Sequence, residues 1–203
     1  GKTTTVINLA TSLSILGQNN LIIDLDPQGN ATTGLGKSNN DERNNIYNLL
    51  IKKIKLKEVI QKTDIKNLDI IGSNVNLSGL EVETANDSNR AFVLKQILDE
   101  EKDNLLSMYD NIFIDCPPSL SLLTIMALVA SNELLVPLQT EFFALEGITQ
   151  LVKTIDRIKV NLNPNLKVRG ILLTMFDKRN KLSTQVDKEA RSYFKDKVYK
   201  TVI

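Results

Sequence analysis

The chain has 203 residues, of which 42% are hydrophobic and 24% charged, and its formal net charge is +1. This composition is typical of a globular domain, and no apolar run approaches the length of a membrane span. Cys116 is the single cysteine and histidine is absent, which excludes a disulfide framework within one chain, a cysteine-based metal site and histidine catalysis. The chemistry must therefore come from carboxylates, lysine, backbone N–H groups and a hard cation.

The chain begins with Gly-Lys-Thr-Thr, the closing half of a phosphate-binding loop. In the full pattern a glycine and four further residues precede Gly-Lys-Ser/Thr, and the loop cradles phosphates and Mg²⁺. Residues 3–17 are predicted to form a helix that ends at Gly17. Its apolar stripe consists of Val6, Leu9, Ala10, Leu13 and Leu16. We therefore expect a fragment that lacks its first strand and most of the phosphate loop.

Six apolar runs have the length of strands: 21–26, 68–71, 112–116, 134–138, 168–174 and 198–203. Helical patterns are found at 3–17, 45–61, 90–107, 120–130, 145–160 and 183–195. This alternation predicts an α/β fold with a doubly wound, mostly parallel sheet and helices on both faces, as in the three-layer sandwich of P-loop nucleotide triphosphatases. Residues 1–203 are expected to form one such domain. Because the runs 112–114 and 134–138 are continuously apolar, they are expected to be buried on both faces.

Three aspartates lie at the carboxyl ends of predicted strands, at the edge where open α/β sheets bind ligands. Asp115 closes an apolar strand, a position from which an acid holds Mg²⁺ opposite the hydroxyl of the phosphate loop. Asp24 and Asp26 alternate on one strand, so both are expected to point to the same face. We assign the orientation of the attacking water to Asp26 and a structural or metal-shell role to Asp24. The alternatives are that Asp115 only caps a turn and that one of the pair only bonds to loop backbone.

Five motifs together resemble the ParA-type partition ATPases of the MinD/ParA superfamily. They are Gly-Lys-Thr-Thr-Thr-Val-Ile-Asn-Leu-Ala at 1–10, Asp-Leu-Asp-Pro-Gln-Gly-Asn-Ala-Thr at 24–32, Ile-Asp-Cys-Pro-Pro-Ser-Leu at 114–120, Glu-Phe-Phe-Ala-Leu-Glu-Gly at 141–147 and Leu-Thr-Met-Phe-Asp-Lys-Arg at 173–179. They keep their order over nearly the whole chain. The family has a deviant phosphate loop, Lys-Gly-Gly-x-Gly-Lys-Thr, and a Pro-Arg-Asn segment near the base. The resemblance therefore implies that the chain is truncated at both ends.

The resemblance implies an Mg²⁺-dependent ATPase with ATP and Mg²⁺ as cofactors. It assigns nucleotide binding to Gly1, Lys2, Thr3 and Thr4. Lys2 would hold the β- and γ-phosphates and act in catalysis, Thr3 would ligate Mg²⁺, and Thr4 would contact the α-phosphate. Asp26 would position the hydrolytic water, and Asp115 would belong to the metal shell.

Three residues of the second half are assigned to the nucleotide as well. Glu141 resembles a residue that approaches the partner's nucleotide across a dimer. Met175 and Phe176 lie where the family's chain passes the adenine, or they are core residues at the end of a strand.

The family forms a homodimer across ATP, binds DNA without sequence preference in that state, and is stimulated by a ParB-like DNA-binding protein. Residues 177–200 carry eight basic and four acidic residues, and basic side chains supply phosphate contacts. The candidates for DNA contact are Arg179, Arg191, Lys195, Lys197 and Lys200. Arg191 and Lys195 are expected to share a helix face. A cytoplasmic, nucleoid-associated protein without membrane contact is implied.

Other classes use the same scaffold. Small-molecule ligases and kinases such as dethiobiotin synthetases need an acceptor pocket, for which the sequence has no motif. MinD-like ATPases bind membranes through a C-terminal amphipathic helix, but the motif at 24–32 favours the partition branch. The nitrogenase iron proteins need several cysteine ligands, which Cys116 alone does not supply. A DNA scaffold without hydrolysis would have no use for Asp26.

Overall fold

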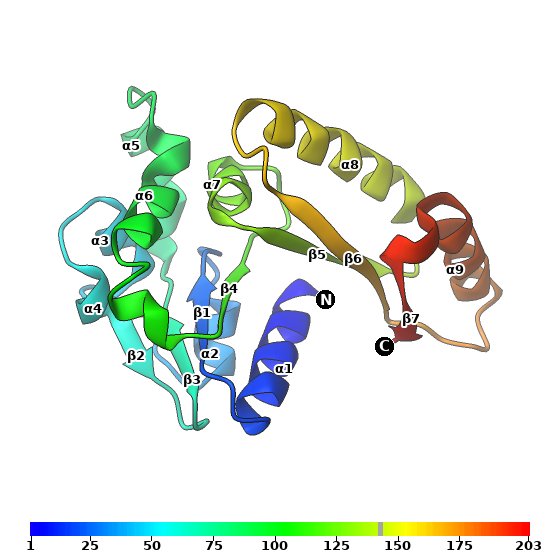
Figure 1. The fold of residues 1–203 in the computed structure, drawn as a ribbon, viewed down its shortest axis with the longest axis horizontal. Coiled ribbons are helices and arrows are strands. Elements are labelled where there is room, and N and C mark those ends of the chain that lie inside the picture. The colour runs from blue at the N-terminus through cyan, green and yellow to red at the C-terminus, as the bar shows by residue number, and fades with distance from the viewer. Residues whose placement is uncertain (142–143) are drawn as a thin grey trace. The chain divides into compact units, whose positions relative to one another are not determined.

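The computed structural model describes residues 1–141 and 144–203, which divide into two compact units (Figure 1). The N-terminal unit consists of residues 3–130. The C-terminal unit consists of residues 131–203 together with Gly1 and Lys2. Each unit has its own sheet, and both sheets are wholly or mostly parallel. The predicted α/β class is confirmed.

The sheet of the N-terminal unit has the order β2-β3-β1-β4, in which β1 is parallel to both neighbours and β2 is antiparallel to β3. Its strands are β1 (Asn20–Asp24), β2 (Ile60–Lys62), β3 (Leu68–Ile71) and β4 (Asn111–Asp115). The α-helices are α1 (Lys2–Ile15), α2 (Asn30–Gly34), α3 (Ile46–Leu50), α4 (Leu56–Val59), α5 (Leu80–Glu83), α6 (Val93–Glu100) and α7 (Leu122–Ala130). Short 3₁₀ helices are η1 (Val75–Gly79), η2 (Arg90–Phe92) and η3 (Leu105–Met108).

The core of this unit is built on β1, whose five residues are all buried. Successive side chains of a strand point to opposite faces of the sheet. Leu21 and Ile23 therefore pack with residues of α3, α6 and α7, whereas Ile22 packs with Ala10 of α1 and Ala31 of α2. Helices thus cover both faces of β1, which gives the three layers predicted from the sequence.

The buried face of α1 differs from the predicted stripe. Its buried residues are Thr5, Ala10 and Ser14. Leu9 and Leu16, by contrast, are 37% and 78% exposed. The physical reason is that small side chains allow a close approach to the sheet, and Ser14 Oγ accepts a hydrogen bond from Asn20 Nδ2 at 2.8 Å. The predicted helix end is confirmed, because Gly17 has a φ of +93° just beyond it.

The prediction of a single helix over 45–61 is wrong, because this stretch forms α3, a turn, α4 and β2. Lys52 has a φ of +59°, in the left-handed region where a helix cannot continue, and residues 60–62 pair with β3 instead. The predicted helix at 90–107 is shorter too, since α6 ends at Glu100. The six predicted strands are confirmed to within two residues, whereas α2, β2, η1 and α5 were not predicted. β4 is the last strand of its sheet, so residues 112–114 are half-buried rather than buried on both faces.

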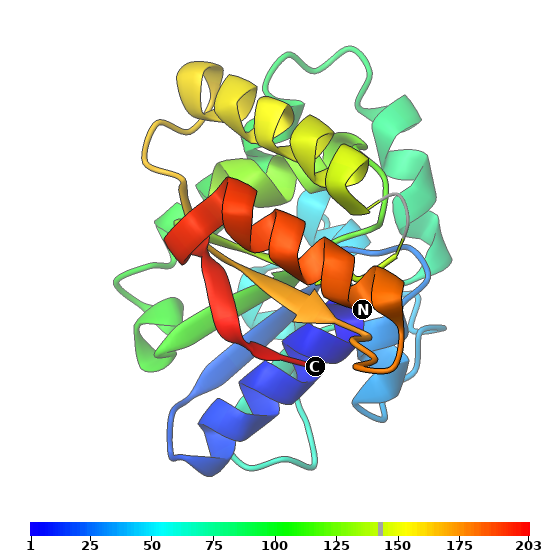
Figure 2. The ribbon, with the colours of Figure 1, turned by 90° about the vertical axis from the view of Figure 1, so that its right-hand side faces the viewer.

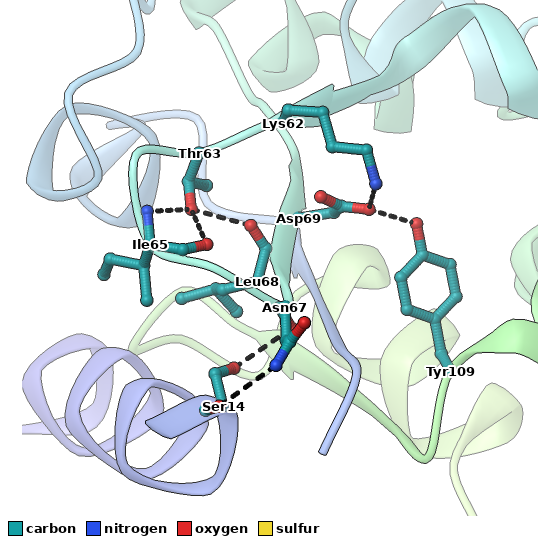
Figure 3. Close-up of polar contacts among 8 residues, drawn as sticks. All are labelled: Ser14, Lys62, Thr63, Ile65, Asn67, Leu68, Asp69 and Tyr109. Carbon is teal, nitrogen blue, oxygen red and sulfur yellow. Dashed lines mark hydrogen bonds and ion pairs between the residues drawn. The ribbon is translucent and has the colours of Figure 1, made fainter. Parts of the chain in front are cut away.

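A polar cluster fixes the β2–β3 hairpin (Figure 3). The side chain of Asp69, which is 5% exposed, accepts from Lys62 Nζ at 2.8 Å and from the Tyr109 hydroxyl at 2.6 Å. Burial, together with the hydrogen bond to Asp69, raises the pKa of Tyr109. The cluster therefore ties β2, β3 and the segment before β4 to one another.

The C-terminal unit has a parallel sheet in the order β5-β6-β7. Its elements are β5 (Glu133–Gln139), α8 (Ala144–Asn161), β6 (Lys167–Thr174), α9 (Lys181–Phe194), η4 (Lys195–Lys197) and β7 (Val198–Val202). Figure 2 shows α8 and α9 side by side over one face of this sheet. Of residues 134–138 in β5, Val136 and Leu138 are buried and the other three are half-buried. The predicted burial on both faces is therefore confirmed at two of the five residues. Within the described residues of both units, no helix is long and apolar enough to cross a membrane.

Candidate functional site

The three aspartates singled out in the sequence lie at the carboxyl ends of β1 and β4. Asp24 and Asp115 are register partners on these neighbouring parallel strands, and they are 0% and 1% exposed. One residue further on, the Leu25 N–H donates to Asp115 O at 2.9 Å, and Asp26 follows. The structure therefore brings the three side chains to one edge of the sheet, the edge at which ligands bind in parallel α/β folds.

Asp24 is anchored by the segment that follows it. Its Oδ1 accepts from the Asp26 N–H at 3.2 Å, and its Oδ2 accepts from both the N–H and the hydroxyl of Thr32, at 2.8 and 2.7 Å. Burial raises the pKa of the Asp24 carboxyl above its ordinary value of 3.8, and the bonds from Thr32 oppose this shift. Asp24 thus joins the end of β1 to α2.

Asp26 lies beyond the strand, because β1 ends at Asp24; the predicted alternation of the two acids on one strand is wrong. Its Oδ1 accepts from the Gln28 N–H at 2.9 Å, and its carbonyl accepts from the Gly29 N–H at 2.9 Å. Gly29 then starts α2 with a φ of +61°. Oδ2 of Asp26 accepts no hydrogen bond within the described residues. The turn therefore fixes the carboxylate through one oxygen and leaves the other for a ligand or a water molecule.

The start of α1 lies at the same edge. A short turn at 16–19 joins α1 to β1, so the helix begins at the end of the sheet where β1 finishes (Figure 1). The first turn holds Lys2, Thr3 and Thr4 and contains no acidic residue. The N–H groups of a first helical turn and the helix dipole make such an N-terminus favourable for phosphate.

The donors at this edge fit a magnesium ion better than a transition metal. Among the described residues there is no cluster of three or more histidine, cysteine or acidic side chains that could hold a metal. Mg²⁺ typically takes one or two protein oxygens and keeps several waters, often beside substrate phosphates. A buried carboxylate at Asp115 and a hydroxyl at Thr3 match that preference.

In the C-terminal unit, Glu141 and Met175 follow the neighbouring strands β5 and β6. The Thr140 hydroxyl donates to Met175 O at 3.0 Å, and the Phe176 N–H donates to Ile203 O at 2.9 Å. Met175 has a φ of +55° and is 64% exposed, so it is not a core residue. Glu141 is exposed, while residues 142–143 of the same motif lie outside the described part of the chain.

Two of the predicted DNA contacts are engaged in ion pairs. Arg191 Nε donates to Asp187 Oδ1 at 2.7 Å, and the Arg179 guanidinium bonds both oxygens of Asp177, which lowers the pKa of that carboxyl. Arg191 and Lys195 do not share a helix face: α9 ends at Phe194, and Lys195 has a φ of +52°. Lys197 and Lys200 are exposed in η4 and β7.

The start of α9 forms a basic hollow of about 440 Å³. Its lining consists of Lys178, Arg179, Lys181, Thr184, Gln185, Lys188 and Glu189. Lys181 and Lys188 are exposed and form no ion pair within the described residues. These lysines belong to the basic segment 177–200, but they were not among the predicted DNA contacts. The signal that could have found them is their spacing of seven residues, which places them on one face of a helix.

A match to the AAA domain family model extends over residues 1–168. The chromosome partitioning protein ParA of Caulobacter vibrioides is 46% identical over the whole chain, which covers 75% of that protein. The sporulation initiation inhibitor protein Soj of Bacillus subtilis is 45% identical over the whole chain, which covers 79% of it. Among solved structures, a cobyrinic acid a,c-diamide synthase from Mycobacterium smegmatis with bound ADP and magnesium is 32% identical. It has a TM-score of 0.87 over 96% of this chain and 77% of its own.

Proposed function

Because the chain belongs to the ParA/Soj family of chromosome-partitioning ATPases, we propose that it binds ATP with Mg²⁺, dimerises across the nucleotide and binds DNA. Hydrolysis of ATP then releases the DNA. The observation that carries this proposal is the gathering of three buried aspartates at the edge of the sheet where α1 begins.

The residues at that edge have distinct roles in binding and hydrolysing ATP. Gly1, Lys2, Thr3 and Thr4 bind the phosphates, with Lys2 at the β- and γ-phosphates and Thr4 at the α-phosphate. Thr3 and Asp115 hold Mg²⁺, which when bound neutralises charge that develops on the phosphate oxygens. Asp26 offers its second carboxylate oxygen to the attacking water and orients it toward the γ-phosphate.

We propose that residues 1–203 belong to one nucleotide-binding domain. β4 is the last strand of its sheet and its residues 111–114 are only half-buried. A parallel strand added beside β4 would cover them and would place a phosphate loop next to Asp115. This arrangement supports the proposal of a single domain.

The C-terminal unit contributes to the base and to the dimer. Met175 and Phe176 lie beside the adenine, a role supported by the exposed, left-handed Met175. Glu141, exposed after β5, approaches the nucleotide of the partner subunit. A ParB-like DNA-binding protein stimulates hydrolysis, and the complex acts in the cytoplasm on the nucleoid.

DNA binds to the basic hollow at the start of α9. Phosphate contacts need cations that are not already neutralised, and Lys178, Lys181 and Lys188 are better suited than Arg191, which is paired with Asp187. Lys195, Lys197 and Lys200 extend the basic surface beyond the helix. The expected binding is independent of sequence and falls steeply with salt.

A second candidate function is an ATP-dependent ligase that acts on a small molecule. The similarity to the cobyrinic acid a,c-diamide synthase favours it. The two candidates differ in what hydrolysis requires. A partition ATPase turns over ATP with DNA and a ParB-like protein and needs no organic acceptor, whereas a ligase turns over only when its acceptor is present.

The test measures phosphate release, dimerisation and DNA retention in the full-length protein, with and without ATP. The proposal expects a dimer and a DNA complex only with ATP, and phosphate release without any organic acceptor. DNA binding of equal affinity without nucleotide would refute the ATP-gated mechanism. Phosphate release that depends on a carboxylic acid acceptor would favour the ligase.

A further inference from the structure

One buried hydroxyl links three segments of the N-terminal unit that meet where the strands β1 and β3 end. Thr32, which is fully buried in α2, donates from its Oγ1 to Asp24 Oδ2 at 2.7 Å. The same oxygen accepts from the Ser73 N–H at 2.9 Å, just after β3. The hydroxyl therefore uses both its donor and an acceptor site, and it joins the ends of β1 and β3 to the start of α2.

The packing around Thr32 fixes the direction of that hydroxyl. A Cβ built at Gly72 would lie 3.1 Å from Thr32 Cγ2 and 3.5 Å from its Oγ1, so the backbone of β3's end is in close contact with the threonine. Threonine has few χ1 rotamers, and the backbone at Gly72 lies against one side of Thr32. The side chain therefore has little freedom to rotate about χ1. A fixed hydroxyl in turn holds the Asp24 carboxylate.

Asp24 passes this constraint on to Asp26. Its other oxygen, Oδ1, accepts from the Asp26 N–H at 3.2 Å, at the point where the chain leaves β1 and enters the turn. We propose that Thr32 is a positioning residue for hydrolysis, which acts through Asp24 on the backbone of Asp26 and so sets where the Asp26 carboxylate lies. This inference rests on the proposed function, in which Asp26 orients the attacking water.

The chain offers a matched pair of threonines for the test. Thr33, the next residue, is exposed, and within the described residues its hydroxyl bonds only to carbonyls of its own turn, Gly29 O at 3.1 Å and Asn30 O at 3.4 Å. Thr32→Val keeps the shape of the side chain but removes both hydrogen bonds of the hydroxyl. Thr32→Ser keeps the hydroxyl, and Thr33→Val makes the same chemical change one position away.

The experiment measures kcat and KM for ATP in the full-length protein and in these variants, with thermal unfolding as a check of folding. Thr32→Val is expected to lower kcat by about tenfold to a hundredfold, the effect of a misplaced catalytic group. KM is expected to stay within about threefold, because the phosphate contacts are made elsewhere. Thr32→Ser and Thr33→Val are expected to retain kcat within about threefold.

A folded Thr32→Val protein with the kcat of the wild type would overturn the inference. So would a folded Thr32→Ser protein whose kcat falls by about tenfold or more, and this result remains decisive if the valine variant does not fold. Asp26→Ala is measured beside them. If it retains wild-type kcat, the catalytic assignment of Asp26 fails; if it loses kcat while Thr32→Val does not, only the role of Thr32 fails.

Discussion

The double change Lys181→Ala with Lys188→Ala tests the DNA surface on α9. Both lysines are exposed in the basic hollow and neither forms an ion pair within the described residues. Each lysine that neutralises one phosphate contributes about 0.9 to the slope of log K against log salt. If both contact phosphates in each subunit of a dimer, the double variant lowers this slope by about 3.6.

The assay is fluorescence anisotropy of a labelled duplex at several salt concentrations, with ATP present and dimerisation checked by sizing. Arg191→Ala is the matched control on the same helix, because its guanidinium is held by Asp187 at 2.7 Å. For Arg191→Ala, the slope of log K against log salt is expected to differ from the wild-type slope by less than about one. A wild-type slope in the double lysine variant, or a larger change in the Arg191 variant, would refute the placement of DNA on the hollow.

Three further predictions concern stability, protonation and nucleotide affinity. Tyr109→Phe removes a donor from the buried Asp69 carboxylate and should lower the free energy of unfolding in urea by about 2 kcal/mol; unchanged stability would contradict the role of the cluster. Because burial raises the pKa of Asp24, its ¹³C carboxyl resonance should titrate above 3.8, and stability should fall as pH rises from 3.8 through that pKa. A midpoint at or below 3.8 would show that hydrogen bonds outweigh burial. A polypeptide that carries a complete phosphate loop ahead of Gly1 should bind ATP more tightly in calorimetry than residues 1–203, because the loop binds through aligned N–H groups; equal affinity would contradict this role of the loop.

The strands and the acidic edge could be predicted from the sequence because both depend on local order. An apolar run that stops at Asp115 marks the end of a strand, and parallel strands place their ends at one edge. The same reasoning placed Asp24 at that edge. For Asp26 the edge was predicted correctly but the orientation of the side chain was not, because the strand ends two residues earlier and a turn, rather than the alternation of the strand, sets that side chain.

The remaining errors concern features that tertiary contacts decide. The periodicity of α1 favours leucine on the buried face, but a close approach to the sheet selects Thr5, Ala10 and Ser14 instead. The role of Thr32 depends on the end of β3, which is 41 residues away along the chain. The pairing of Arg191 with Asp187, by contrast, is a local contact four residues apart within α9. It decides which cations of that helix remain available, and its spacing was visible in the sequence.

The central claim is that Asp26 orients the water that attacks the γ-phosphate. It is tested most directly by measuring phosphate release and ATP binding on the same samples of the Asp26→Ala variant. In the full-length protein with DNA and a ParB-like partner, this variant should bind ATP and dimerise as the wild type does but should release little phosphate. The reason is that the phosphate and Mg²⁺ contacts survive while the attacking water is no longer oriented. Phosphate release at the wild-type rate would contradict the assignment of hydrolysis to Asp26.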